Sequence, residues 1–200
     1  MPRGMLQENY RRIIMYDKIE LRIPLSMEVA ASLRAGDMVY ITGEIYTARD
    51  AAHQRLYDDI LAGKPVPFNF EGAVVYYAGP CPAKPGKPIG SVGPTTAGRM
   101  DKFSPMLIEH GLRFMIGKGL RDQAVIDKMV EYGGIYFAAI GGAAALMAKC
   151  VLSAEVIAYP ELGTEAIRKL EVKDFPVIVA IDSRGKNYYD IGRKKYEVVS

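Results

Sequence analysis

The spacing of apolar and polar residues changes repeatedly along the chain and predicts alternating strands and helices. Alternating or continuous apolar runs rich in Val, Ile and Tyr are typical of strands. Such runs occur at residues 19–24, 38–46, 73–78, 113–117, 135–140, 155–158 and 177–181. Apolar residues at helical spacing occur at residues 26–33, 48–61 and 122–132, from the Thr95-Thr96 pair to His110, and from Gly142 to Cys150. Strands and helices that alternate in this order predict a single α/β domain with a mixed sheet.

The chain is long enough for one sizeable domain with its own core. We expect residues 1–18 to form a loose N-terminal arm and residues 19–200 to form that domain. Residues 79–90 begin with Gly79-Pro80 and then contain Pro82, Pro85 and Pro88 at regular spacing. This segment is expected to be a loop that is mobile or contacts a partner.

Composition narrows the classes of function. A net charge of +3 with scattered basic residues is not typical of nucleic-acid binding. The most apolar stretch, residues 135–148, is shorter than the roughly 20 residues that span a bilayer, and residues 1–18 do not resemble a secretory signal. We therefore expect no nucleic acid, no membrane and a cytoplasmic location. The two cysteines, Cys81 and Cys150, fit a reducing compartment and cannot hold a zinc ion or an iron–sulfur cluster unaided.

The segment from Gly93 to Asp101, with the sequence GPTTAGRMD, combines two hydroxyls, a guanidinium and a carboxylate within nine residues. Thr95 and Thr96 are expected to cap a helix that begins here, and a helix start suits a carboxylate or phosphate. Arg99, one turn later, is placed to bind such an anion with two hydrogen bonds. The alternative is a capped helix with a surface arginine.

Three further segments place polar residues directly after predicted strands. In the first, Arg49 and Asp50 begin a helix and His53 lies one turn on, although an internal Arg49–Asp50 pair and a structural histidine are the alternatives. In the second, Lys118 stands between two glycines, from where its ammonium group can reach a ligand. In the third, the Gly141-Gly142 pair either presents backbone N–H groups or permits close packing. Two arginines and a lysine at strand ends, where α/β proteins place ligands, suit a small dicarboxylate.

Taken together, these segments resemble the β subunit of the iron–sulfur hydro-lyases, which include class I fumarate hydratase and L-tartrate dehydratase. The resemblance rests on TARDAAH at 47–53, GPTTAGRMD at 93–101, GKG at 117–119 and AYPELGTEA at 158–166, in the right order. It covers nearly the whole chain from about residue 19 onward, and the nine-residue segment is its most specific part.

The resemblance implies a swivelling β/β/α fold and the reversible hydration of fumarate to L-malate. It also implies a [4Fe–4S] cluster that is held by three cysteines of a partner α subunit, so that this chain binds no metal and acts within a hetero-oligomer.

Residue by residue, the resemblance assigns Arg49, Arg99 and Thr96 to binding of the substrate, whose carboxylates contact the two arginines. Thr95 corresponds to a hydroxyl near the carbon-bound proton, and Lys118 to an active-site lysine that stabilises developing negative charge. The resemblance assigns Asp50, His53 and Asp101 to positions from which they orient the arginines.

Three alternatives remain open at this point. L-tartrate dehydratase is the first, although Ala97-Gly98 favours fumarate because the members associated with tartrate carry Ser-Met at these positions. The second is a non-catalytic anion-binding or assembly module that has kept the fold. The third is phosphate or nucleotide binding at Thr95.

Overall fold

The structure is a computed structural model that describes residues 18–139 and 144–196. Most of the expected arm, residues 1–17, and the Gly141-Gly142 pair lie outside the described residues.

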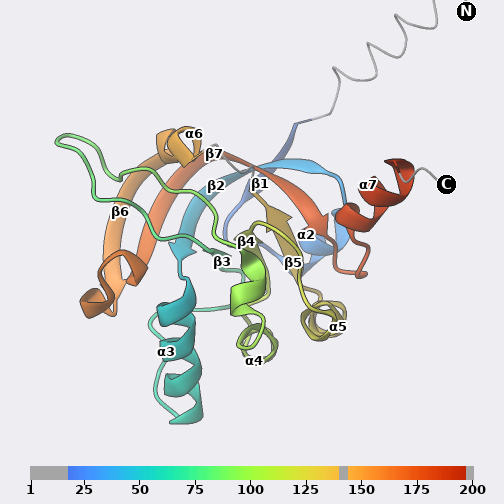
Figure 1. Ribbon diagram of the computed structural model, residues 1–200, viewed down its shortest axis with the longest axis horizontal. Coiled ribbons are helices and arrows are strands. Elements are labelled where there is room, and N and C mark those ends of the chain that lie inside the picture. The colour runs from blue at the N-terminus through green and yellow to red at the C-terminus, as the bar shows by residue number, and fades with distance from the viewer. Residues whose placement is uncertain (1–17, 140–143, 197–200) are drawn as a thin grey trace, which may run out of the picture.

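Seven strands form one mixed sheet, with helices packed against it (Figure 1). The strands are β1 (Ile19–Arg22), β2 (Met38–Thr47), β3 (Val74–Tyr76), β4 (Phe114–Gly117), β5 (Ile135–Ala138), β6 (Val151–Ala158) and β7 (Ile167–Ile181). The α-helices are α2 (Met27–Ser32), α3 (Asp50–Leu61), α4 (Ser104–Glu109), α5 (Gln123–Tyr132), α6 (Ala144–Lys149) and α7 (Tyr188–Tyr196). Two short 3₁₀ segments are η1 (Ala97–Met100) and η2 (Pro160–Glu165). The predicted single-domain α/β fold with a mixed sheet is confirmed.

The sheet closes on itself through the long strand β7. Strands β1 to β5 run parallel to one another in chain order, and β7 runs antiparallel to both β5 and β2. The result is a ring of β2, β3, β4, β5 and β7, with β1 beside β2 and β6 beside β7. Because the ring strands β2 to β5 are parallel, their carboxyl ends lie at one rim.

Alternate residues of the parallel strands enter two different apolar clusters. Val74 and Tyr76 of β3 point into the cluster enclosed by the ring, together with side chains of β2 and β7. Val75 and Tyr77 point the other way and pack with residues of α3, α4 and α5. These helices cover the outer face of the parallel strands (Figure 1). The period-two alternation of a strand that is buried on both faces explains why this run contains no polar residue.

The predicted continuous helix from Thr95 to His110 is wrong. Thr95 N–H donates to the carbonyl of Tyr77 at 2.7 Å, and the carbonyl of Thr95 accepts from Lys118 N–H at 3.2 Å. A β-bridge joins Thr96 to Lys118, so the two threonines extend the sheet by a short added strand. Only η1 and α4 are helical, and the side chain of Thr96 makes no capping bond within the described part of the chain. Backbone pairing with neighbouring segments outweighs the local capping preference of threonine.

His53 lies in the interface between α3 and β3 with none of its surface exposed. Its Nδ1 lies 3.1 Å from the carbonyl oxygen of Arg49, and its ring meets the ring of Tyr77 edge-on. Nε2 has no hydrogen-bond partner among the described residues. Burial of the ring lowers the pKa of His53 to about 4, so the ring is neutral near pH 7.

Asp101 and Arg121 form a buried ion pair behind η1. Arg121 Nε donates to Asp101 Oδ1 at 2.6 Å, and the two side chains are 0% and 2% exposed. The guanidinium also donates to Ser104 Oγ at 2.8 Å and lies over the ring of Tyr77. These contacts fasten the turn after η1 to the segment that leads into α5.

We expect Asp101→Asn to lower the free energy of unfolding by about 3–5 kcal/mol, because it leaves the Arg121 guanidinium buried without a counter-charge. Urea denaturation monitored by circular dichroism measures this change. The control is Glu71→Gln, which removes the carboxylate of the surface pair with Arg113 at 3.0 Å and should cost less than about 1 kcal/mol. Equal effects of the two variants would contradict a structural role for the buried pair.

We also expect His53 to make stability depend on pH. The unfolded chain protonates this histidine below pH 6.5, whereas the native chain does so only near pH 4. Its contribution is therefore fully present above pH 6.5 and is lost as the pH falls toward 4. Between pH 7 and pH 5 the loss should be about 2 kcal/mol. His53→Leu should remove this part of the pH dependence in urea titrations, whereas the exposed control His110→Leu should retain it.

Candidate functional site

The rim formed by the carboxyl ends of the parallel strands collects most of the predicted site residues. Arg49 and Asp50 follow β2, and Lys118 follows β4. The Thr95-Thr96 pair lies between the ends of β3 and β4, since its backbone bonds to Tyr77 after β3 and to Lys118 after β4. Parallel strand order therefore unites segments that are about 70 residues apart in the chain.

The carboxylate of Asp50 joins the two arginines. Arg49 Nε lies 3.1 Å from Asp50 Oδ2, and Arg99 Nε lies 2.7 Å from Asp50 Oδ1. Burial opposes ionisation of Asp50, but a backbone hydrogen bond and the two guanidinium groups hold the pKa of this carboxyl below its usual value. Asp50 therefore carries a full negative charge near pH 7 and fixes Arg49 and Arg99 beside each other.

Glu165, at the end of η2, contacts both the first turn of α3 and the Arg49 side chain. Its Oε2 accepts the N–H of Ala51 in the first turn of α3 at 2.8 Å, and its Oε1 lies 3.5 Å from an Nη atom of Arg49. Arg49 itself stands at the N-cap of α3 and makes no capping bond through its side chain within the described residues. Glu165 thus supplies the cap that Arg49 does not and orients the Arg49 guanidinium at the same time.

Gly79, in the loop after β3, leaves the room that Arg49 occupies. A Cβ atom at Gly79 would lie 3.0 Å from Arg49 Cδ and 3.1 Å from the carbonyl oxygen of Thr164. Such contacts are tighter than most real Cβ contacts, so a side chain there would displace Arg49 or the η2 segment. The glycine is required by close approach, not by backbone conformation.

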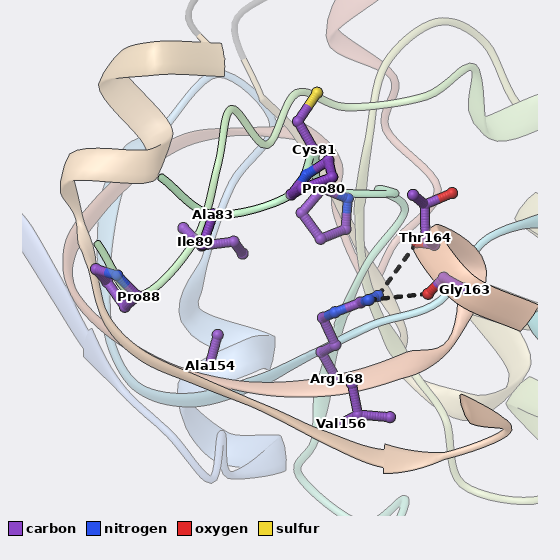
Figure 2. Close-up of a pocket in the computed structure, with 11 residues that line it drawn as sticks. Pro80, Cys81, Ala83, Pro88, Ile89, Ala154, Val156, Gly163, Thr164 and Arg168 are labelled. Atoms are coloured by element: carbon purple, nitrogen blue, oxygen red, sulfur yellow. Dashed lines mark hydrogen bonds between the residues drawn. The ribbon is translucent and has the colours of Figure 1, made fainter. Parts of the chain in front are cut away.

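A cavity of about 360 Å³ lies next to this corner, between the loop after Gly79, strand β6 and the end of η2 (Figure 2). Arg168 is the charged residue in its lining, and its guanidinium donates to the carbonyls of Gly163 at 2.8 Å and Thr164 at 3.3 Å. Figure 2 shows the guanidinium turned toward these carbonyls and away from Pro88 and Ile89. Arg168 therefore braces the end of η2 that carries Glu165.

Lys118 and the threonines form the other half of the rim. The Lys118 side chain is exposed and makes no ion pair with any described residue. Thr95 is half-buried and Thr96 exposed. Gly117, the last residue of β4, permits the close approach of this edge, because a Cβ there would lie 3.1 Å from both Ala97 Cβ and a ring atom of Tyr77.

The three residues that were expected to orient the arginines differ in whether they contact them. Asp50 contacts both arginines as expected. Asp101 does not contact them, because its carboxylate is neutralised by Arg121 inside the protein. His53 reaches Arg49 only through the backbone carbonyl, which positions the residue but not its guanidinium. The Gly141-Gly142 pair is outside the described residues.

Sequence reasoning missed Glu165, Arg121 and Arg168. Glu165 lies within the segment 158–166 that carried part of the resemblance, but its contact with Ala51 spans 114 residues and no local pattern indicates it. One feature of the sequence could have indicated a buried ion pair at Arg121. It falls between two predicted elements and close to the GKG segment, where an arginine needs either solvent or a counter-charge.

The rim can bind an anion. Three cations, Arg49, Arg99 and Lys118, stand against two carboxylates, Asp50 and Glu165, which leaves one excess positive charge. Asp50 uses the Nε atoms of both arginines, and the side chain of Arg99 is 50% exposed. Its outer nitrogens are therefore available for the paired hydrogen bonds that guanidinium groups make to carboxylates.

The described ranges contain no group of three or more His, Cys, Asp or Glu side chains that could hold a metal ion. Cys81 and Cys150 are both free thiols. This chain's described residues do not fit an iron–sulfur cluster as its ligands. Among the described helices, none is both long and apolar enough to cross a membrane.

The comparisons with a family model and with known proteins point to the same family. The family model described as Fumarase C-terminus matches residues 3–192. The chain is 42% identical over 177 residues to an anaerobic class I fumarate hydratase of Escherichia coli, which covers 86% of this chain and 32% of that protein. It is 36% identical over 176 residues to fumarate hydratase 2 of Leishmania major, with 86% and 31% covered.

A third relative has a different length. The chain is 36% identical over 180 residues to a putative L(+)-tartrate dehydratase subunit beta of Methanocaldococcus jannaschii, which covers 86% of this chain and 92% of that protein. The chain thus spans about a third of the length of the two fumarate hydratases and nearly all of the tartrate dehydratase subunit. The chain belongs to the family of the fumarase C-terminal region, which occurs both in class I fumarate hydratases and as a tartrate dehydratase β subunit.

Proposed function

We propose that this chain is the β subunit of a cytoplasmic two-subunit iron–sulfur hydro-lyase that reversibly hydrates fumarate to L-malate. The observation that carries the proposal is the junction of Arg49 and Arg99 on Asp50, at the same strand rim as Lys118 and Thr95. The family and the identity of its fumarate hydratase relatives support the choice of substrate.

The arginines of this chain bind the substrate carboxylates. Asp50 holds each guanidinium through Nε, so the outer nitrogens of Arg99 are directed to a ligand while Glu165 restrains Arg49. Two anchored cations fix both ends of a short diacid and thereby orient the double bond. The single excess charge predicts weak binding of a dianion by this chain alone, so further contacts must come from the partner.

Lys118 and Thr95 act at the reacting carbons. Hydration adds hydroxyl to one carbon of fumarate and a proton to the other, and negative charge spreads into the adjacent carboxylate before the proton arrives. The Lys118 ammonium stabilises this charge. In hydration the Thr95 hydroxyl donates the proton to carbon and takes another from a carboxyl group of the partner beside it. In the reverse direction it removes the proton and passes it to that carboxylate, which it needs because a threonine is a poor base in water.

The cluster belongs to the partner in this proposal. The described residues of this chain supply no set of ligands, and we propose that the cysteines come from an α subunit that closes over the rim. Asp50, Glu165 and the arginines then form the wall of the pocket opposite the partner.

L-tartrate dehydratase is the second candidate. The match to almost the whole length of a putative L(+)-tartrate dehydratase β subunit favours it. A Cβ at Gly98 would meet nothing closer than 3.7 Å, so a side chain can begin at this position without a clash. The two activities differ by few contacts, and direct turnover measurements separate them.

The first test is turnover by the reconstituted pair. We expect the purified chain alone to be folded but inactive, and the complex with a cysteine-bearing α subunit and iron to convert fumarate and L-malate faster than either tartrate. Under anaerobic conditions, the assay follows fumarate absorbance for fumarate and L-malate, and formation of oxaloacetate for the tartrates. Hydration of fumarate by the isolated chain would contradict the proposal, and faster turnover of a tartrate would favour the second candidate.

The second test is Arg99→Ala in that complex. Loss of a charge-assisted contact to a carboxylate is worth about 1.5–3 kcal/mol, so kcat/KM should fall by roughly 10-fold to 150-fold. Arg193→Ala is the control, because Arg193 lies on α7 with a side chain that is 75% exposed. Unchanged turnover in Arg99→Ala would favour the non-catalytic module.

A further inference from the structure

We propose that this chain carries a second anion site, formed by other residues than Arg49, Asp50 and Arg99, that binds a small organic polyanion. The site is a cavity of about 620 Å³ between the loop after β3, helix α6 and the start of β6. This inference does not depend on the proposed function.

The lining of the cavity is basic. Lys84 and Lys87 come from the loop, and Lys149 comes from the last turn of α6. No Asp or Glu occurs among the described residues that line the cavity, and none of the three lysines forms an ion pair with a described residue. Three exposed lysines that line one hollow, with no carboxylate among its described lining residues, raise the local concentration of anions. A ligand with two or more phosphate or carboxylate groups satisfies them best.

The base of the loop is fastened by a backbone hydrogen bond and by apolar packing. Cys81 N–H donates to the carbonyl of Ser91 at 3.0 Å, which ties the two arms of the loop together. The arms approach so closely at Gly90 that a Cβ there would lie 2.4 Å from the Cys81 oxygen. Ile89 and Val92 anchor the returning arm in the core of the ring. Lys84 and Lys87 therefore extend from a base that is joined to the core of the ring.

The floor of the cavity is apolar and its size suits a small molecule. Ile89, Ala148 and Val151 contribute hydrocarbon surface beside the three lysines. Small-molecule sites commonly occupy about 300–1,000 Å³ and combine apolar walls with a few charged groups. The ligand class is therefore a polyanion with an organic body, such as a nucleoside triphosphate or a tricarboxylate.

Isothermal titration of the full chain with ATP, inorganic tripolyphosphate, citrate and inorganic phosphate, at constant ionic strength, tests this site. We expect ATP or citrate to bind more tightly than inorganic phosphate. Lys84→Gln with Lys87→Gln should weaken binding about tenfold, and Lys149→Gln should weaken it further. The control double variant, Lys64→Gln with Lys186→Gln, makes the same change in charge on exposed lysines outside the cavity and should bind normally.

Three results would overturn the assignment. Equal weakening in the test and control variants would show that only net charge matters. If none of the four probes binds at physiological ionic strength, the chain has no such site. Normal anion binding with loss of α subunit association in the Lys84 and Lys87 variant would reassign these lysines to docking of a protein.

Discussion

The candidate site depends on keeping two guanidinium groups together, which their own repulsion opposes. Two unit charges held a few ångströms apart at a partly solvated surface repel by on the order of 1–3 kcal/mol. The Asp50 carboxylate between Arg49 and Arg99 offsets this repulsion and sets the geometry at the same time. Glu165 adds a second negative charge from a segment more than 100 residues away. The rim therefore holds its cations without a ligand and retains a small positive excess.

Several features of the fold bring the site segments together and hold them in place. Parallel pairing of β2, β3 and β4 brings the three site segments to one edge. Glycines at positions 79 and 117 let Arg49 and the added Thr95-Thr96 strand approach closely. Behind them, the buried Asp101–Arg121 pair fixes the turn after η1, and the buried His53 packs α3 against β3. These buried polar groups hold in place the segments that carry the candidate site residues.

The sequence predicted those parts of the molecule that depend on local pattern. Strand ends followed by charged residues at Arg49 and Lys118 were visible as changes of periodicity, and both lie at the rim. The helix expected at Thr95 failed because the Thr96–Lys118 bridge is a non-local pairing that competes with local capping. Strand β7 was predicted only over residues 177–181, because consecutive polar residues at 168–169 and 173–174 interrupt the apolar alternation of its first half. The roles of Glu165 and Arg121 depend on contacts across the fold and have no signature in local spacing.

Closure of the ring has a consequence for how the molecule assembles. The β2–β7 ladder pairs residues 38–47 with residues 168–178, so the strand that completes the ring is synthesised long after its partner β2. Contacts of such long sequence separation carry a large loop-closure entropy and form slowly. Until β7 is synthesised, β2 and β5 expose unpaired backbone edges that favour association with other chains. The incomplete ring of β2 to β5 is therefore the species that needs protection from association until β7 pairs with it.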